Sequence, residues 1–262
     1  MILDKIVAHK KKEVERSKQI ISIEQLEKSV LFNRYPISLT EKLITENSNG
    51  IIAEFKRRSP TKGILNDKVN VIEVVKQYEL AGVCGSSILT DKEFFGGSQK
   101  DIIDVRNEVN IPLLRKDFMI DEYQFLEAKS WGADVVLLIA AILTPEQVSH
   151  FTGLAKSLSM EVLLELHDEI ELGHVNDMVD MVGINNRNLK TFEVDIQRSL
   201  KMAQQIPPDK VKIAESGISA VSTVRLFKEN GFRGFLMGEN FMKEADPGEA
   251  FAKFVRELNT PL

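Results

Sequence analysis

Cysteine and long apolar runs are the clearest deficits of this sequence. Its one cysteine, Cys84, cannot form an internal disulfide or a structural zinc site built from several thiolates, so stability must come from packing. No apolar run reaches the roughly 20 residues that span a bilayer. The N-terminal segment MILDKIVAHKKKEVERSK has its charges after its apolar residues, the reverse of a secretory signal peptide. These absences predict a cytoplasmic protein without a membrane partner.

A surplus of positive charge is missing as well. The chain has 34 Lys and Arg residues against 39 Asp and Glu residues, and its formal net charge is −5. Because affinity for nucleic acid depends on a basic surface, this balance argues against a nucleic-acid partner. What the chain does have is size and apolar content, since 43% of its 262 residues are hydrophobic, which is enough to bury a sizeable core. We therefore expect a globular protein that acts on a small molecule.

Alternating patterns from Ile51 onward predict the fold. Short apolar runs rich in β-branched residues alternate with segments whose apolar residues repeat at i, i+3, i+4 and i+7, as in βαβ units. Eight such units fit a closed (β/α)8 TIM barrel better than an open doubly wound sheet, and no GxGxxG follows the first run. No linker rich in Gly, Pro or Ser divides the chain, so residues 1–262 are predicted to form one domain. The expected strands begin at Ile51, Ser86, Pro112, Val135, Glu161, Met181, Lys212 and Gly234.

Residues 1–48 precede the first expected strand and are predicted to form an N-terminal helical extension. Helical periodicity in LDKIVAHKKKEVERSKQ and SLTEKLITEN supports this prediction. We interpret the HKKKEVERSK run as a solvated helix face, because long charged side chains normally keep their charged ends in water.

Charged residues occur where four of the strands are expected to end. Glu54 and Lys56 share one face of the first strand by its period of two, and Lys116, Glu165 and Glu215 lie at the ends of the third, fifth and seventh strands. One interpretation is an ion-pair network that closes the top of the barrel, since unpaired charges are rare in buried strands. The catalytic groups of such barrels lie at the carboxyl ends of the strands. The whole set therefore favours acid–base chemistry on an anionic substrate.

Two glycine turns, SGIS at 216–219 and MGEN at 237–240, follow the seventh and eighth expected strands. Glycine lets a phosphate approach the backbone, and a helix N-terminus offers N–H groups to it. Barrels often hold phosphate after these two strands, so the turns predict a phosphate site. The four histidines have no metal-ligand spacing, and we interpret His167, at the end of the fifth strand, as a structural hydrogen-bonding residue.

Taken together, the motifs resemble those of the indole-3-glycerol phosphate synthases, in order through all eight units. The resemblance implies an enzyme of tryptophan biosynthesis that uses no metal or organic cofactor. Such an enzyme converts 1-(2-carboxyphenylamino)-1-deoxyribulose 5-phosphate into indole-3-glycerol phosphate, carbon dioxide and water. The similar segments are AEFKRRSPTKG (53–63), ILTDKEFFGGS (88–98), IPLLRKDFMIDEYQFLEAKSWGADVVLLIAAIL (111–143), LLELHDEIEL (163–172), VGINNRNLKTFEVD (182–195), AESGIS (214–219) and FLMGENFM (235–242).

The resemblance also implies catalytic roles. Lys116 is the general acid that protonates the ribulose carbonyl while the aromatic carbon attacks it. Lys56 holds anionic parts of the substrate, and Glu165 shares the dehydration step with Lys56. The other members of the implied catalytic set, which orient these groups or anchor the polar network, are Glu54, Asn185, Glu215 and Ser216.

The implied binding residues surround this set. The phosphate is expected on backbone N–H groups of the two glycine turns, and Arg187 is assigned to the substrate carboxylate. Glu239 departs from the family, which often has a small hydroxyl residue at this position. The resemblance therefore implies a phosphate contact from the Glu239 backbone but not from its side chain. The phosphate-binding residues are Ser216, Gly217, Gly238 and Glu239, aided by Lys56 and Ser59, and the wall for the aromatic ring is formed by Phe95, Phe118 and Leu137.

Two other enzyme functions fit parts of the pattern, and a non-enzymatic barrel is a third alternative. A phosphosugar lyase or aldolase could form a Schiff base on Lys56 or Lys116. The phosphate turns alone also fit a barrel isomerase acting on phosphoribosylanthranilate, although the two lysines argue against it. A non-enzymatic barrel should have a broken charge set, and here the set is whole. The expected partner is a small anionic phosphosugar, and the expected assembly is a monomer or a weak homodimer.

Overall fold

The eight expected strands form a closed parallel barrel in the computed structural model, which describes residues 2–188 and 193–260. Around the ring the order is β1-β10-β9-β8-β7-β6-β5-β4, and each strand begins within one residue of its predicted start, so the TIM barrel prediction is confirmed. The strands are β1 Ile51–Phe55, β4 Gly85–Leu89, β5 Leu113–Lys116, β6 Val135–Ile139, β7 Glu161–Leu166, β8 Met181–Asn185, β9 Val211–Glu215 and β10 Gly234–Met237.

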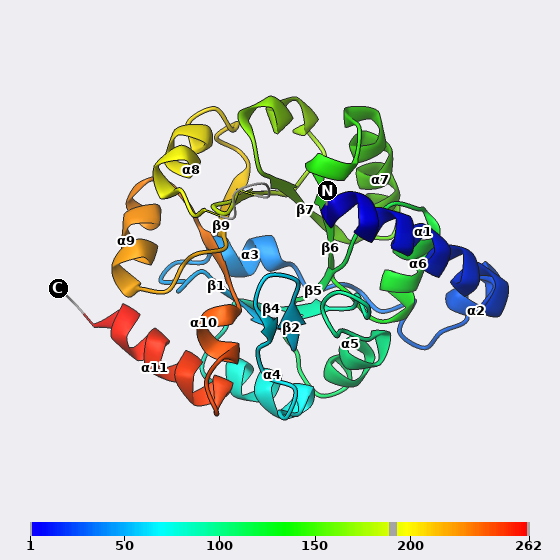
Figure 1. Ribbon diagram of the computed structural model, residues 1–262, viewed down its shortest axis with the longest axis horizontal. Coiled ribbons are helices and arrows are strands. Elements are labelled where there is room, and N and C mark those ends of the chain that lie inside the picture. The colour runs from blue at the N-terminus through cyan, green and yellow to red at the C-terminus, as the bar shows by residue number, and fades with distance from the viewer. Residues whose placement is uncertain (1, 189–192, 261–262) are drawn as a thin grey trace.

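Helices surround this ring of strands (Figure 1). Local signals set their ends: Thr144 forms a capping box with Gln147 at the start of α7, and Pro145 occupies the first turn, where its missing N–H costs nothing. The helices between and after the strands are α4 Val71–Leu80, α5 Gln99–Arg106, α6 Tyr123–Ser130, η1 Ala140–Ile142, α7 Pro145–Ser157, η2 Glu169–His174, α8 Ile196–Ala203, α9 Val221–Glu229, α10 Glu239–Met242 and α11 Pro247–Asn259.

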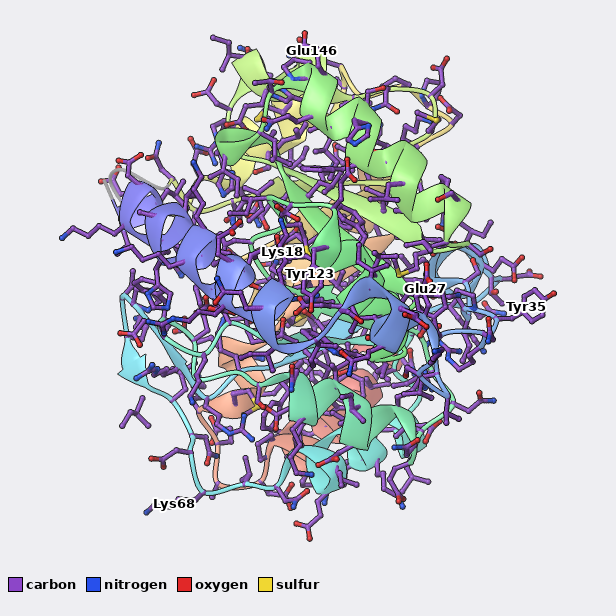
Figure 2. The ribbon with its side chains drawn as sticks, turned by 90° about the vertical axis from the view of Figure 1, so that its right-hand side faces the viewer. Lys18, Glu27, Tyr35, Lys68, Tyr123 and Glu146 are labelled. Atoms are coloured by element: carbon purple, nitrogen blue, oxygen red, sulfur yellow. The ribbon has the colours of Figure 1, made fainter. Side chains whose placement is uncertain are left out.

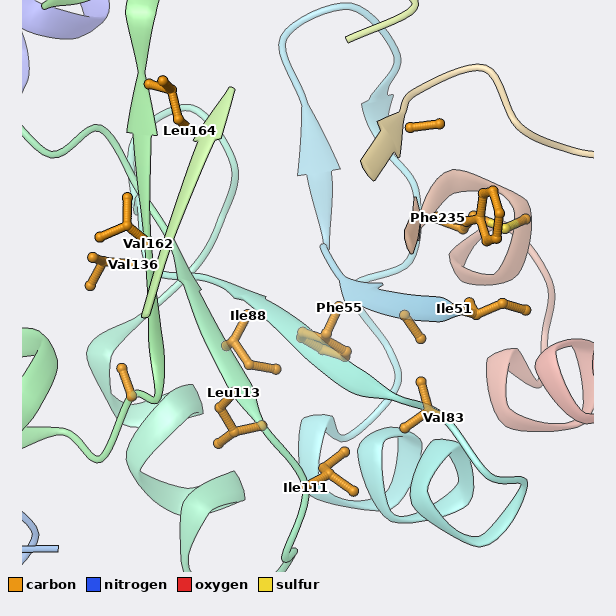
Figure 3. Packing of buried hydrophobic residues seen from close by; sticks show 14 of the residues in the cluster. Ile51, Phe55, Val83, Ile88, Ile111, Leu113, Val136, Val162, Leu164 and Phe235 are labelled. Carbon is orange, nitrogen blue, oxygen red and sulfur yellow. The ribbon is translucent and has the colours of Figure 1, made fainter. Parts of the chain in front are cut away.

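Every barrel strand except β4 contributes to two apolar cores, because side chains alternate between the two faces of the barrel wall. The outer core lies between strands and helices, and it includes Phe55, Val162 and Phe235 (Figure 3). The inner core fills the barrel, and Leu114 and Leu163 belong to it. The interior of the barrel is therefore filled by side chains.

The N-terminal extension consists of α1 Ile2–Ile20, α2 Ile23–Glu27 and α3 Leu39–Ile44. Leu39 and Leu43 of α3 pack into the inner core, and a Cβ atom at Gly85, the first residue of β4, would lie 2.8 Å from Leu39 Cδ1. Helix α3 therefore closes the amino end of the barrel, and it is visible through the ring of strands in Figure 1. Helix α1 passes over the carboxyl ends of the strands. Its C-terminal half is fixed by Lys18 Nζ, 2.7 Å from Asp121 Oδ2, and by the Tyr123 hydroxyl, which donates to the carbonyl of Ile21 at 2.8 Å (Figure 2).

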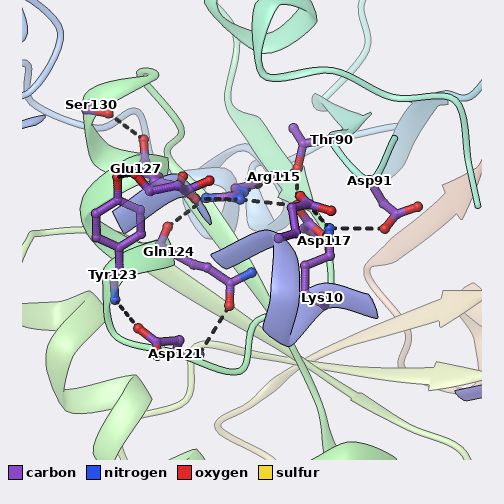
Figure 4. Close-up of polar contacts among 12 residues, drawn as sticks. Lys10, Thr90, Asp91, Arg115, Asp117, Asp121, Tyr123, Gln124, Glu127 and Ser130 are labelled. Atoms are coloured by element: carbon purple, nitrogen blue, oxygen red, sulfur yellow. Dashed lines mark hydrogen bonds and ion pairs between the residues drawn. The ribbon is translucent and has the colours of Figure 1, made fainter. Parts of the chain in front are cut away.

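The prediction of a solvated face on α1 is wrong at Lys10, which is 1% exposed. Lys10 Nζ lies 2.8 Å from Asp117 Oδ1 and 3.0 Å from Asp91 Oδ2, and Figure 4 shows it between the two carboxylates. Both aspartates follow strand ends that are distant in the sequence, so the local pattern of α1 could not reveal them. Burial is tolerated because the ammonium is paired with carboxylates.

A short hairpin in the β1–α4 connection was not predicted. Its strands, β2 Arg58–Ser59 and β3 Gly63–Ile64, pair antiparallel, and Gly63 adopts a positive φ of 68° where the chain turns back. The hairpin brings Ser59 to the carboxyl end of the barrel. Among the described helices, none is long and apolar enough to cross a membrane.

Candidate active site

A cavity of about 570 Å³ opens at the carboxyl ends of the strands. Every residue that the sequence assigned to catalysis or binding lines it, although those residues come from segments scattered along the chain. These residues are Glu54, Lys56, Ser59, Phe95, Lys116, Phe118, Leu137, Glu165, Asn185, Arg187, Glu215, Ser216, Gly217, Gly238 and Glu239.

Four charged side chains form one layer across the barrel. Glu54, Lys116, Glu165 and Glu215 come from β1, β5, β7 and β9, which are alternate strands of the ring, as expected for one interior layer. Lys116 Nζ is 2.7 Å from Glu215 Oε2 and 3.3 Å from Glu165 Oε2. Lys56 lies above this layer and forms an ion pair with Glu54, as their shared strand face predicted.

Two glycines make room for these carboxylates. A Cβ atom at Gly183 would lie 2.1 Å from Glu215 Oε1, and one at Gly238 would lie 2.7 Å from Glu54 Oε1. Any larger residue at either position would collide with an acidic side chain of the layer. Gly238 therefore serves the charged layer as well as the turn in which the sequence placed it.

The charges of the layer shift one another's pKa. Burial alone would lower the pKa of Lys116, but the Glu215, Glu165 and Glu54 carboxylates raise it overall, so the amine stays protonated. Burial alone would raise the pKa of Glu165, but Lys116, His167 and Asn185 lower it overall. Burial raises the pKa of Glu215 to about 7, with the Glu165 carboxylate also raising it and Lys116 opposing the rise. Near neutral pH the layer thus contains a fixed cation, a fixed anion and a carboxyl group that can exchange a proton.

Glu165 has polar neighbours on both of its oxygens. Asn185 Nδ2 donates to Glu165 Oε1 at 2.9 Å, and His167 Nε2 lies 2.9 Å from the same oxygen. Lys116 approaches the other oxygen. The sequence assigned His167 no part in the site, yet it lines the cavity. Its position two residues after Glu165 on β7 was the available signal, because residues at this spacing share a strand face.

The two glycine turns lie at one side of the cavity. Ser216 and Gly217 have φ values of 65° and 68°, and Asn186 Nδ2 donates to the carbonyl of Ser216 at 2.7 Å. A non-glycine residue in the left-handed region is strained, so this bond helps to hold the turn. In the second turn, the N–H groups of Phe241 and Met242 bond to the carbonyl of Gly238 and start the helical ladder of α10. The Glu239 N–H precedes that ladder, and Glu239 lines the cavity.

The Glu239 side chain brings a negative charge to this side. Its Oε1 is 3.7 Å from Lys62 Nζ and its Oε2 is 4.0 Å from Arg187 Nη2. The carboxylate thus contacts two cations that an anionic substrate would also attract. No sequence motif indicated this arrangement, because Lys62 and Arg187 belong to separate connections.

The opposite side of the cavity is apolar. The Phe95 and Phe118 rings pack with centroids 6.0 Å apart at 38°, and Leu137 belongs to the same cluster. Helix α1 adds Ile2, Leu3 and Ile6, which the sequence analysis did not assign to the site. Nothing in the local periodicity of α1 distinguishes a face that lines a cavity from a face that packs on a core. Among the described residues, no group of three His, Cys, Asp or Glu side chains could hold a metal ion.

Comparisons with known proteins identify the family. The family model described as indole-3-glycerol phosphate synthase matches residues 3–258. The indole-3-glycerol phosphate synthase of Bacteroides thetaiotaomicron is 48% identical over 258 residues, 98% of each chain, and that of Ruminiclostridium cellulolyticum is 40% identical over 97% of this chain and 98% of its own. Among solved structures, a chain of the tryptophan synthase complex from Pyrococcus furiosus matches with a TM-score of 0.60 and 15% sequence identity. The match covers 80% of this chain and 97% of the Pyrococcus chain. At this identity the likeness shows a shared fold alone. The chain belongs to the indole-3-glycerol phosphate synthase family, the carboxy-lyases that form indole-3-glycerol phosphate in tryptophan biosynthesis.

Proposed function

We propose that the charged layer carries out ring closure, decarboxylation and dehydration of 1-(2-carboxyphenylamino)-1-deoxyribulose 5-phosphate. The observation that supports this most is the Lys116 ammonium, held between Glu165 and Glu215 at the floor of the cavity. As the aromatic carbon attacks the ribulose carbonyl, Lys116 gives its proton to the carbonyl oxygen, which becomes a hydroxyl. Loss of carbon dioxide returns the bonding electrons to the ring and restores aromaticity.

Dehydration then needs an acid and a base on different sides of the new ring. We assign these roles to Lys56, which follows β1, and to Glu165 on β7, which stands directly across the eight-strand ring from β1. Glu165 takes a proton from the substrate while the hydroxyl leaves with a proton from Lys56 as water. Glu54, which pairs with Lys56, and Asn185, which donates to Glu165, are assigned orienting roles. Adding the substrate and following indole fluorescence tests the whole assignment.

Substrate binding is assigned to the two sides of the cavity. The phosphate would lie at the glycine turns, on the N–H groups of Ser216, Gly217, Gly238 and Glu239, with Lys56 and Ser59 nearby. The aromatic ring would pack against Phe95, Phe118 and Leu137, and Arg187 would meet the carboxylate. We also propose that the chain is a monomer or a weak homodimer in the cytoplasm, and sedimentation velocity tests the oligomeric state.

A Schiff-base aldolase is disfavoured by the electrostatics of Lys116. A lysine nucleophile needs a lowered pKa, whereas the three surrounding carboxylates raise the pKa of Lys116. Borohydride in the presence of a ketose phosphate should therefore trap no covalent adduct. A stable adduct at Lys116 or Lys56, detected by mass spectrometry, would favour the aldolase instead.

Replacing Glu165 with glutamine is expected to uncouple the two products. Glutamine keeps the shape and two hydrogen-bonding atoms but cannot exchange a proton, so carbon dioxide should appear faster than indole in a rapid-quench experiment. If both appear at the same slowed rate with a large loss of Tm, Glu165 is a structural charge. The dehydration role would then pass to Lys56 or Glu54.

Replacing Glu239 with glutamine is expected to lower the Kd for inorganic phosphate by about two- to tenfold. The carboxylate competes with an anion for Lys62 and Arg187, and one unit charge about 4 Å away is worth about 1 kcal/mol in water. Thermal shift at rising phosphate concentration measures the change, because a ligand that binds only the native state raises Tm. The matched control is Glu249→Gln on α11, where the carboxylate pairs with Arg256 outside the cavity. An equal phosphate shift in wild type and Glu239→Gln would contradict a phosphate site at this turn.

A further inference from the structure

His167 is a buried cavity residue for which the proposed reaction has no role. It is 7% exposed and continues the inward face of β7, two residues after Glu165. Its Nε2 lies 2.9 Å from Glu165 Oε1, the oxygen that also accepts from Asn185 Nδ2. Both ring nitrogens are buried and neither has a hydrogen-bond partner in the described part of the chain, so the contact with Glu165 is an ion pair. In the site, the imidazole is therefore directed to one protein group, the Glu165 carboxylate.

Hydrogen bonds within its own loop hold the backbone of His167 in place. The His167 N–H donates to Glu171 Oε2 at 2.6 Å, and the Asp168 N–H donates to the same oxygen at 3.3 Å. Asp168 in turn caps η2, which begins at Glu169. These bonds hold the backbone from which the His167 side chain extends, so its Cα stays next to Glu165 at the end of β7.

The charges around the imidazole favour its protonated form. The groups that face it are Glu165 on its own strand, Glu171 of η2 and Glu215 of β9, with the Lys116 ammonium of β5 on the far side of Glu165. Burial alone would lower the pKa of His167, but these three carboxylates raise it overall. A protonated imidazole places a positive charge beside the carboxylate, and this charge stabilises the ionised form of Glu165.

We propose that His167 is a positioning residue for dehydration, which holds the Glu165 carboxylate ionised and aimed into the cavity together with Asn185 and Lys116. This inference rests on the dehydration role proposed for Glu165. His167 itself exchanges no proton with the substrate in this step. Its contribution is to keep the base in one charge state and one orientation before the hydroxyl leaves.

The test is a double-mutant cycle with Glu165→Gln. His167→Leu should lower kcat about tenfold and change KM less than twofold. The acid limb of its kcat–pH profile should move to higher pH, because Glu165 loses a cation that lowers its pKa. His167→Gln, which keeps a donor without a charge, should recover part of kcat but not the pH profile. In the Glu165→Gln background, His167→Leu should have no further effect on kcat.

The matched control is His174→Gln. His174 belongs to the same loop, but its ring nitrogens lie 3.0 Å from the carbonyls of Glu171 and Leu143 rather than near Glu165. This variant should leave the pH profile unchanged. The inference is overturned if the kcat losses of the two single variants multiply in the double mutant. It is also overturned if His167→Gln has the kcat and pH profile of wild type. Full activity of Glu165→Gln alone would overturn the proposed role of Glu165 first, so the two failures are distinguishable.

Discussion

Replacing Lys116 with alanine is expected to lower kcat about a hundredfold or more while the barrel stays folded. The variant removes the group assigned to protonate the carbonyl oxygen, and general acids contribute about a hundredfold to ten-thousandfold in rate. The fold should survive, although the replacement leaves two buried carboxylates without their cation. Glu215 already has a pKa raised to about 7, so it can take up a proton and remove one of the two negative charges.

The measurement is steady-state indole fluorescence together with a thermal melt of the same sample. Lys116→Arg is the informative companion variant, because it restores the positive charge between Glu165 and Glu215 but is a far poorer proton donor. We expect the arginine variant to recover Tm and not kcat. More than a tenth of wild-type activity in Lys116→Ala would contradict the assignment of the general acid.

Replacing Lys10 with methionine is expected to reduce the free energy of unfolding by about 3 to 5 kcal/mol. The methionine fills a similar volume but leaves Asp91 and Asp117, which are 0% and 3% exposed, without their shared cation. Asp117 would keep Arg115, whose Nη2 is 3.1 Å from Asp117 Oδ2. Urea denaturation of the two proteins measures the difference. Lys11→Met, on the exposed side of the same helix, is the matched control and should change stability by no more than about 0.5 kcal/mol.

The loss in Lys10→Met should depend on pH in a defined direction. Burial alone would raise the pKa of Asp117, but Lys10 and Arg115 lower it below its usual range. The stability that this carboxylate contributes is therefore fully present above the usual aspartate pKa and is lost as the pH falls toward the lower folded-state value. The gap between wild type and Lys10→Met should be widest near neutral pH and should shrink in acid. A gap that stays constant with pH would mean that packing rather than charge holds Lys10.

The same denaturation curves test the domain organisation. We expect residues 1–262, including the extension over 1–48, to form one domain. Helix α3 packs into the inner core, and Lys10 of α1 forms ion pairs with Asp91 after β4 and Asp117 after β5. Fluorescence and circular dichroism should then report one coincident transition. A separate early transition for the helical extension would contradict a single domain.

The sequence by itself determined the barrel, its eight strands and the charged residues at the strand ends. Strand positions follow from apolar runs and turn residues that are neighbours in the chain, so local patterns are sufficient to locate them. The period of two also determined that Glu54 and Lys56 point the same way, and the barrel fold determined which strand ends converge. For that reason the charged residues at the strand ends line one cavity, whereas binding residues such as Phe95 and Arg187 were implied by the resemblance to the family.

Tertiary structure alone decided how the charges pair and which of them are buried. The burial of Lys10 depends on two aspartates at strand ends far from it in the chain. The raised pKa of Glu215 depends on its burial and on the Glu165 carboxylate from another strand. His167 was visible in the strand pattern, but its relation to Glu165 required the actual distance between the two side chains. Periodicity reports whether a side chain faces inward. The pKa of that side chain depends on burial and on charges a few ångströms away, and only the folded chain brings those charges together.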